Sequence, residues 1–413
     1  MNLHAMLLER QAAFRPVTVG LIGAGKFGTM FVSQVRLTDG MHLVAVADLD
    51  VTRARRQLRT AGWNDEAMSA SSLGNALARG TTHVMEDAEA LIACPEIEVI
   101  VEATGVPAAG IRHALSAIRC GKHIVMVNVE ADALAGPLLA RKAKAAGVVY
   151  SLAWGDQPAL ICEHVDWARA CGFNVVAAGK GTRYEPHYHR STPDTVWDIL
   201  DKYLSITDRN SINPKMFNSF VDGTKSGIEM TAVCNATGLV PQSEGLGFPA
   251  ASRFELADVC KPKAAGGTLE KAGVTEVTSS VYRDGRDVPH HLALGTYVVF
   301  EGDSDYARRC FKEYAMLPDK SGRYAALYRP IHMIGLELGV SVASVALRKE
   351  PSGARVPGAA LAGECLQQNS LQSTQAAVMR SAEKAARAAA AIRLVGGQRG
   401  ASVPRMITQH SSS

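Results

Sequence analysis

Short apolar segments alternate with amphipathic segments along the first part of the chain. The apolar segments are rich in Val and Ile, which predicts buried strands at 17–22, 42–47, 97–101, 123–128 and 148–152. Helical patterns follow the first, third and fourth of these segments, and the insertion between the second and third, residues 53–96, is also expected to be helical. Strands that alternate with helices predict a parallel doubly wound sheet, so we expect a Rossmann-type α/β domain over residues 1–155.

The pattern changes after Trp154 and predicts a second, α+β domain over residues 156–350. The helices expected there are 158–171, 194–204 and 223–236, and the expected strands are 274–282 and 292–301. An apolar, Gly-containing helix over 328–347 is expected to pack back on the first domain. Residues 351–413 hold no Phe, Tyr or Trp and are rich in Ala and Ser, which predicts a poorly ordered tail.

Composition narrows the class of protein. Of the 413 residues, 47% are hydrophobic and 20% are charged, and the net charge of +4 is concentrated in the tail, which has seven basic and two acidic residues. The remaining body carries about −1 by subtraction, so we expect no nucleic-acid partner. No segment predicts a membrane span. The eight cysteines contain no Cys-x-x-Cys pair, which favours a reduced, cytoplasmic protein, and we expect a homo-oligomer.

A glycine-rich turn after the first strand predicts a dinucleotide site. The turn reads Gly23-Ala24-Gly25-Lys26-Phe27-Gly28, and Asp48 follows twenty residues after its last glycine. In this pattern the first glycine allows a tight turn, the second lets a pyrophosphate approach, and the third lets helix and strand pack closely. Loops after two later strands should flank the ribose and nicotinamide. The cofactor-binding residues predicted in this way are Gly23, Gly25, Lys26, Phe27, Gly28, Asp48, Thr104, Gly105 and Asn128.

The sequence leaves NAD and NADP open as cofactors. Asp48 is placed to bind both ribose hydroxyls, which favours NAD because a carboxylate repels a 2′-phosphate. Arg53, Arg55 and Arg56 follow nearby and are alternative ligands for the 2′-phosphate of NADP, although arginines on a helix more often form a solvated face.

Three charged residues of the second domain predict catalytic chemistry. Asp222, Lys225 and Glu229 are spaced by three and four residues, so on one helix they would share a face. A Lys beside carboxylates near a nicotinamide can polarise a carbonyl or exchange its proton during hydride transfer. The alternative is a row of surface ion pairs, which would contribute little to stability.

The second domain also offers residues suited to an anionic substrate. The segment 179–183 combines two glycines with Lys180, Thr182 and Arg183, and such a loop can hold a phosphate or carboxylate; the alternative is a solvated turn. Asp156 precedes a predicted helix as a cap or a site residue, and His332 is a further substrate-binding candidate. The pair His187-x-His189 is compatible with half a metal site but is more often structural, so no metal ligand is assigned.

Several longer motifs resemble a known family. Residues 121–128, GKHIVMVN, resemble the end of the nucleotide domain of homoserine dehydrogenases, with Val129 in place of the Lys that follows in that family. A closer resemblance, over residues 16–349, is to a bacterial homoserine dehydrogenase-like group that includes enzymes similar to 1-deoxy-D-xylulose 5-phosphate reductoisomerase. Its motifs here are GDQPA at 155–159, GKGTRY at 179–184, STPDTVW at 191–197, FVDGTKS at 220–226 and HMIGLE at 332–337.

This resemblance implies an NADPH-dependent enzyme of isoprenoid precursor synthesis. The homoserine dehydrogenase resemblance implies that an Asp and a Lys one helical turn apart act on the substrate, which supports Asp222 and Lys225. By analogy with the reductoisomerase a divalent metal is compatible with the reaction, but no ligand for it is assigned. Members of the group continue into a small β-rich SAF-type domain, where this chain has its Ala/Ser-rich tail.

The leading prediction is therefore an NAD(P)H-dependent oxidoreductase that acts on a small, anionic sugar phosphate. A dehydrogenase of a sugar acid or of a homoserine-like hydroxy compound is the alternative within the same class. A non-catalytic cofactor-binding regulator, or a truncated inactive copy, is the alternative of another class.

Overall fold

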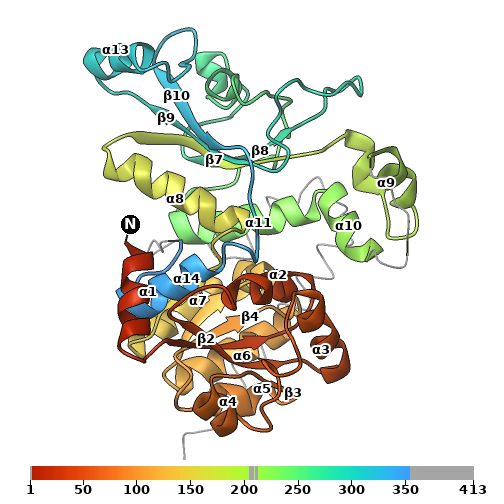
Figure 1. Cartoon of the computed structure of the whole chain (residues 1–413). Helices are drawn as coiled ribbons and strands as arrows, with labels where there is room; N and C mark the ends of the chain where they lie inside the picture. Colours follow the sequence, from red (N-terminus) through yellow and green to blue (C-terminus); the bar gives the residue numbers. More distant parts are fainter. Residues whose placement is uncertain (1, 204–208, 210–212, 354–413) are drawn as a thin grey trace, which may run out of the picture.

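Two sheets, each covered by helices, divide the chain into two domains (Figure 1). The computed structural model describes residues 2–203, 209 and 213–353; the predicted tail lies outside them except for its first three residues. In the first sheet the strand order is β3-β2-β1-β4-β5-β6 and every pairing is parallel. The strands of this sheet are β1 Val17–Ile22, β2 Met41–Ala47, β3 His83–Met85, β4 Val99–Glu102, β5 His123–Met126 and β6 Tyr150–Leu152.

Helices cover both faces of this sheet, as apolar parallel strands require. One face packs on the N-terminal helix, on α2 and α3, and on the C-terminal helices; the other packs on α4 to α7. The predicted doubly wound Rossmann-type α/β fold is confirmed. The helices of this domain are α1 Leu3–Ala12, α2 Lys26–Val35, α3 Val51–Thr60, α4 Leu73–Arg79, α5 Ala88–Ala93, α6 Pro107–Arg119, α7 Val129–Ala145, α14 Gly339–Ala343 and η4 Ser344–Arg348.

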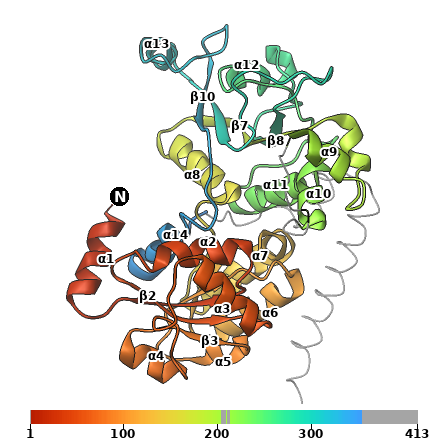
Figure 2. The same ribbon diagram turned by 45° about the vertical axis from the view of Figure 1, so that its right-hand side comes forward.

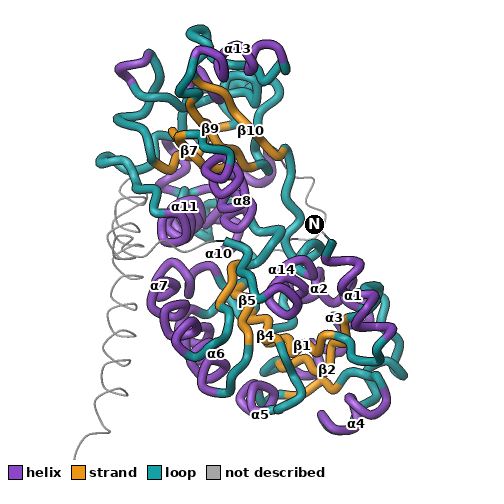
Figure 3. Tube along the Cα trace, turned by 90° about the vertical axis from the view of Figure 1, so that its left-hand side faces the viewer, coloured by secondary structure: helices purple, strands orange, loops and turns teal. Residues whose placement is uncertain are grey.

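The second domain is a mixed four-stranded sheet of order β10-β9-β7-β8. Only β7 and β8 run parallel, and α8 and α11 cover the face that looks toward the first domain (Figure 3). The strands are β7 Asn174–Thr182, β8 Val274–Ser279, β9 Thr296–Glu301 and β10 Tyr324–Arg329. The helices are α8 Gln157–Ala170, η1 Pro186–Arg190, α9 Trp197–Tyr203, α10 Pro214–Val221, α11 Thr224–Thr237, α12 Leu256–Val259, η3 Lys263–Ala265 and α13 Asp305–Glu313.

The predicted helix over 328–347 is wrong in its first half. Residues 324–329 form strand β10, and a helix begins only at Gly339. β10 pairs with β9 over its whole length, so sheet pairing decides the conformation of this apolar segment. Leu338 and Val342 enter the core of the first domain, where the chain returns after its excursion into the second.

Two further strands were not predicted. β3, within the insertion over residues 53–96, forms the edge of the first sheet, and β7 is a central strand of the second. β7 contains the segment 179–182, which was expected to be a phosphate-binding loop. The two glycines of this segment are required by close packing, since there is no room for a side chain. A Cβ on Gly179 would lie 1.7 Å from the backbone oxygen of Glu276, and a Cβ on Gly181 would lie 1.9 Å from the backbone oxygen of Leu292.

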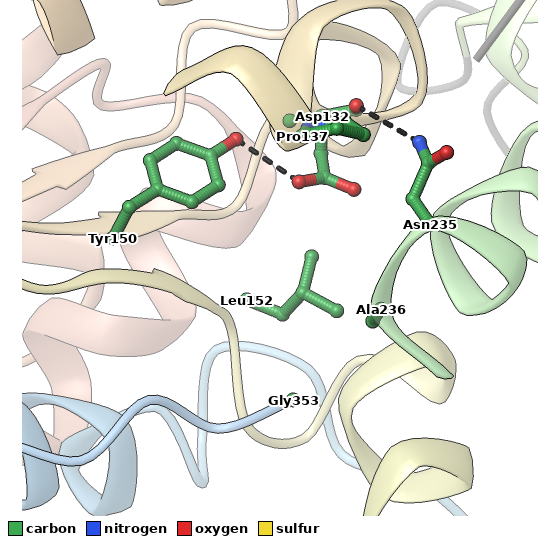
Figure 4. A pocket seen from close by; sticks show the side chains of 8 residues that line it. Asp132, Pro137, Tyr150, Leu152, Asn235, Ala236 and Gly353 are labelled. Carbon is green, nitrogen blue, oxygen red and sulfur yellow. Dashed lines mark hydrogen bonds between the residues drawn. The ribbon is translucent and has the colours of Figure 1, made fainter. Parts of the chain in front are cut away.

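Helix α7 begins at Val129 and passes through a proline. Asn128 caps it, accepting a hydrogen bond from the Ala131 N–H at 3.2 Å. Pro137 has no N–H to donate to the carbonyl of Ala133, one turn earlier. Asn235 of α11 donates its amide to that oxygen at 3.3 Å, and Figure 4 shows its side chain reaching toward α7. The orphaned carbonyl therefore helps to join the two domains.

Replacing Gly179 by alanine tests the close approach of β7 and β8. The new methyl group would meet backbone, not a flexible side chain, so the strands must separate. We expect the free energy of unfolding in urea to fall by about 3 kcal/mol, the upper end of the usual cost of overpacking. Gly25→Ala is the matched control, because nothing lies within 4 Å of a Cβ there. Equal stabilities of the two variants would contradict the packing described here.

Candidate functional site

The second domain lies above the first in Figure 2. A cleft of about 1800 Å³ at the carboxyl ends of the first sheet is lined by residues of both domains. Eight of the nine residues predicted to bind a cofactor line it, the exception being Gly28. Of the residues predicted for substrate and catalysis, all line it apart from Asp222; these are Asp156, Lys180, Thr182, Arg183, Lys225, Glu229 and His332. The fold thus brings together side chains that lie more than three hundred residues apart.

The glycine turn has the shape that a pyrophosphate needs. Gly23 adopts φ 99°, and a Cβ there would lie 2.7 Å from the Ala103 oxygen. A Cβ on Gly28 would lie 2.2 Å from the Gly23 oxygen, so this glycine allows the turn to pack on α2. Gly25 caps α2, and the space beside it is open. An anion in that space would face the unpaired N–H groups of a helix N-terminus, so these residues fit a dinucleotide.

Asp48, at the end of β2, is buried and paired. It accepts hydrogen bonds from the N–H groups of Ala24 at 2.8 Å and Asp50 at 2.9 Å, and from the guanidinium of Arg53 at 2.9 and 3.1 Å. Burial acts to raise the pKa of Asp48, but these donors outweigh it and lower the pKa. The carboxylate at the expected ribose position is therefore ionised and already holds a cation.

Thr104 and Asn128 build one wall of the cleft. The Thr104 hydroxyl donates to the buried carboxylate of Glu102 at 2.5 Å. The Asn128 amide donates to the Val106 oxygen at 3.0 Å and to the Thr104 hydroxyl at 3.4 Å. These bonds fix the loop that contains Gly105, which has φ 67°.

A cluster of charged side chains lies on the opposite side of the cleft. The Lys225 Nζ is 3.0 Å from Glu130 Oε1 and 3.9 Å from Glu229 Oε1. Lys180 Nζ pairs with Glu229 Oε2 and donates to Gln157 Oε1 at 2.9 Å. The side chains of Lys225, Lys180 and Glu229 are only 13%, 7% and 4% exposed. Because these side chains are buried, the structure excludes the alternative that Lys225 and Glu229 belong to a row of ion pairs on the surface.

The cluster spans both domains. Glu130 belongs to the first turn of α7, whereas Lys225 and Glu229 are one turn apart on α11. Glu130 and Gln157 were not assigned to the site from the sequence. Glu130 does carry a recognisable signal, because it lies four residues after the end of the parallel strand β5, at the edge of the sheet where ligands bind.

Burial and pairing set the protonation of these groups. Burial acts to lower the pKa of Lys225, but Glu130, Glu229 and Asp156 outweigh it and raise the pKa. Burial acts to raise the pKa of Glu229, but the charges of Lys180 and Lys225 outweigh the effect of burial, so the pKa is lowered. Asp156 differs: burial, and then the neighbouring Glu229, raise its pKa to about 7. The cluster therefore holds the Lys225 ammonium group, an ionised Glu229 and one carboxyl, Asp156, that titrates near neutral pH.

Asp156 and His332 complete this side of the cleft. Asp156 caps α8, accepting from the Gln157 N–H at 2.9 Å. The ring of His332 donates from Nδ1 to the Leu294 oxygen at 2.7 Å, and burial lowers the pKa of His332. A neutral ring protonated at Nδ1 leaves Nε2 as an acceptor.

The structure does not bring Asp222 to the cluster. The expectation that it shares a helix face with Lys225 is wrong, because α11 begins at Thr224. The Asp222 carboxylate accepts from the Thr224 N–H at 2.8 Å and from the Asn218 amide at 2.9 Å. It fixes the turn that leads into α11 and so acts on Lys225 only through the backbone.

The two histidines considered for a metal site have separate surroundings. His189 donates from Nδ1 to the Asp222 oxygen at 2.7 Å and accepts at Nε2 from the Tyr184 hydroxyl at 2.8 Å, which supports the same turn. His187 lies 3.7 Å from Glu185. Among the residues that the structure describes, no group of three or more His, Cys, Asp and Glu side chains is placed to hold a metal ion.

The cations predicted to hold an anionic substrate are partnered. Lys180 lines the cleft and is bound to Glu229 and Gln157, so its predicted role toward an anionic substrate stays a prediction. Arg183 pairs at 2.8 Å with Asp287, whose side chain is 68% exposed.

Within the described residues, no helix has both the length and the apolar character that a membrane crossing needs.

Comparison with known proteins agrees with this site. Residues 20–152 match the family model of the homoserine dehydrogenase NAD-binding domain, and residues 155–338 match that of the catalytic domain of oxidoreductase DRL. No curated protein matches the chain.

Solved structures resemble the chain at low identity. A homoserine dehydrogenase from Thiobacillus denitrificans is 15% identical, with 83% of this chain and 78% of that chain covered and a TM-score of 0.47. A myo-inositol dehydrogenase from Lactobacillus casei, in complex with NAD(H) and myo-inositol, is 14% identical, with 95% and 98% covered and a TM-score of 0.41. A dipicolinate-bound dihydrodipicolinate reductase from Paenisporosarcina sp. TG-14 is 14% identical, with 80% and 95% covered and a TM-score of 0.37.

The two family models cover adjoining parts of the chain, and each part contributes one side of the cleft. The chain is therefore an NAD(P)-dependent oxidoreductase, in which residues 20–152 are similar to the homoserine dehydrogenase NAD-binding domain and residues 155–338 to the catalytic domain of oxidoreductase DRL.

Proposed function

We propose that the protein reduces a carbonyl group of a small, anionic sugar phosphate with NAD(P)H, in a reaction similar to that of 1-deoxy-D-xylulose 5-phosphate reductoisomerase. The observation that carries this proposal is the buried cluster around Lys225, which faces the glycine turn across one cleft. Such a cluster supplies charge and protons where hydride transfer creates an alkoxide. The eight cysteines contain no Cys-x-x-Cys pair, which supports a reducing, cytoplasmic location. We also propose that the protein is a homo-oligomer.

Each residue of the cluster has a role in this reaction. The bound nicotinamide supplies the hydride. Lys225, held ionised by Glu130 and Glu229, donates a hydrogen bond to the carbonyl oxygen and stabilises the negative charge that develops there. Asp156 gives a proton to that oxygen, since its pKa of about 7 leaves it partly protonated at neutral pH. Lys180 keeps Glu229 ionised and in place.

The carbon shift of a reductoisomerase also needs a group that removes a hydroxyl proton. Glu130 is the more exposed carboxylate of the cluster, at 30%, and it lies in the first turn of α7 beside the cofactor wall. His332, with Nε2 free to accept, is a second acceptor at the same cleft. Thr182 and Arg183 at the end of β7 are proposed to hold the phosphate, with Arg183 exchanging its exposed partner Asp287 for the ligand.

A dehydrogenase of a sugar acid or homoserine-like compound is the alternative, since the same cluster serves a simple hydride transfer. NAD(P)H oxidation by a panel of sugar phosphates, together with NAD(P)⁺ reduction by a panel of sugar acids and hydroxy amino acids, distinguishes the two, because a hydroxy compound gives up a hydride and does not accept one. Turnover of 1-deoxyxylulose 5-phosphate supports the proposal, and turnover of a sugar acid alone supports the alternative. Stoichiometric cofactor binding with no turnover on the panel would indicate a regulator or an inactive copy.

Cofactor choice depends on Arg53. The guanidinium neutralises Asp48 at the ribose end of the cleft and is itself 45% exposed, so it is accessible to a 2′-phosphate. Arg53→Ala leaves a bare carboxylate, and we expect its Kd for NADPH to rise about tenfold relative to that for NADH, as expected for one lost charged hydrogen bond. Arg56, the alternative ligand considered from the sequence, is exposed on α3 and does not line the cleft as Arg53 does, so Arg56→Ala is the control. Unchanged selectivity in fluorescence titrations would assign 2′-phosphate binding elsewhere.

Lys225→Met tests the catalytic assignment. The change keeps the stem of the side chain and removes the ammonium group, while Lys180 still pairs with Glu229. We expect kcat to fall by about 10²–10⁴-fold, the range typical of a lost acid or base, with the NADPH Kd unchanged. Lys142→Met on the exposed face of α7 controls for the loss of a positive charge. Turnover near that of the wild type would remove Lys225 from the mechanism.

Asp156 should set the alkaline limb of the pH profile. Below pH of about 7 its carboxyl is protonated and can donate; above it the proton is lost, so kcat/KM should decline as pH rises through 7. In Asp156→Asn this limb should disappear while kcat falls at every pH. Asp166→Asn, exposed on the same helix, should keep the wild-type profile. A wild-type limb retained by Asp156→Asn would show that another group titrates.

A further inference from the structure

Helix α10 stands opposite the glycine turn although it belongs to the second domain (Figures 1 and 2). Asn213, Lys215, Met216, Phe217 and Phe220 line the same cleft as Gly25 and Lys26. The mechanism above uses none of these α10 side chains. These α10 side chains therefore face the open space beside Gly25, where a ligand of the glycine turn would also contact them.

The face of α10 toward the cleft is apolar and incompletely buried. Asn218 is the one fully buried residue of this helix, whereas Met216, Phe217 and Phe220 are half-buried. The rings of Phe217 and Phe220 meet edge to face, with centroids 6.0 Å apart. Aromatic rings gain most when both faces are covered, so this pair presents a surface suited to a planar or sugar-like ligand.

Two cations flank the same surface. The Lys26 Nζ lies 5.7 Å from the centre of the Phe217 ring, and this is a direct contact between the two domains. Lys26 is also the first residue of α2, where no acidic residue offsets the positive end of the helix. A cation there is unfavourable unless an anion binds nearby. Lys215 is exposed, and within the described part of the chain neither lysine forms an ion pair.

We propose that α10 is the second wall of the dinucleotide site. The pyrophosphate binds at the glycine turn between Lys26 and Lys215, and Phe217 packs over the adjoining ribose. The cofactor then bridges the two domains instead of resting on the first alone. This inference depends on dinucleotide binding and not on the identity of the substrate, so it stands or falls separately from the proposed reaction.

Hydrogen–deuterium exchange of the full chain, with and without NADPH and with no substrate, tests the bridge. We expect NADPH to slow exchange in peptides that cover residues 214–221 of α10 as well as in those of the glycine turn. Protection confined to the first domain would overturn the proposal. Because this measurement uses the wild-type chain, it decides the matter even where a variant fails to fold.

Affinity measurements supply the residue-level test. Phe217→Ala and Lys215→Ala should each raise the Kd for NADPH about tenfold, whereas Phe217→Tyr, which keeps the ring, should bind as the wild type does. Phe254→Ala removes a partly exposed ring that stacks with Arg253 outside the cleft, and Lys263→Ala removes an exposed cation; both are controls. Wild-type affinity in both α10 variants would refute the assignment of these side chains.

Discussion

Two lysine ammonium groups are buried between the domains, and each must have a carboxylate partner to remain charged there. Burying an unpaired charge costs several kcal/mol, so the positions of these partners constrain the structure. Lys180 from β7 and Lys225 from α11 share Glu229, and Lys225 takes a second partner, Glu130, from α7 of the other domain. The pairing therefore fixes a strand and a helix of one domain against a helix of the other. Two further contacts support this arrangement: Asn235 on the Ala133 oxygen joins α11 to α7, and His189 on the Asp222 oxygen supports the turn that leads into α11.

The same constraint supports the proposed chemistry. Because Glu229 is kept ionised by two lysines, its negative charge adds to the effect of burial on Asp156 and raises the pKa of that carboxyl to about 7. One carboxyl is thus ready to donate a proton at neutral pH, while a neighbouring ammonium stays charged. A carbonyl reduction needs a proton donor and a positive charge beside the carbonyl oxygen. Asp156 and Lys225 fit these two roles because their surroundings shift their pKa values differently. The cofactor turn faces this cluster because the carboxyl ends of parallel strands all open on one edge of the sheet.

Features with a local physical cause were predictable from the sequence. The strands of the first sheet are apolar on both faces, and the glycine turn is specified by backbone geometry at Gly23 and Gly28, so both were visible in the residues themselves. The helix predicted over 328–347 began too early, at the last two residues of β10, because a short apolar segment takes its conformation from the strand beside it. The glycines at 179 and 181 suggested a phosphate loop. They are instead required because the backbones of Glu276 and Leu292, which are distant in sequence, approach β7 too closely for a side chain. For the same reason the sequence indicated Lys225 and Glu229 but placed Asp222 beside them in error, and it gave no sign that Lys180 would pair with Glu229.

The central claim is that the cluster around Lys225 is where hydride transfer takes place. A crystal structure of the enzyme with NADPH tests it most directly, through the distance between the nicotinamide C4 and the Lys225 Nζ. We predict about 5–6 Å, enough for one carbonyl group to accept a hydrogen bond from the lysine and stand at reacting distance from C4. A nicotinamide bound more than about 10 Å from Lys225, beyond the span of that carbonyl, would contradict the account.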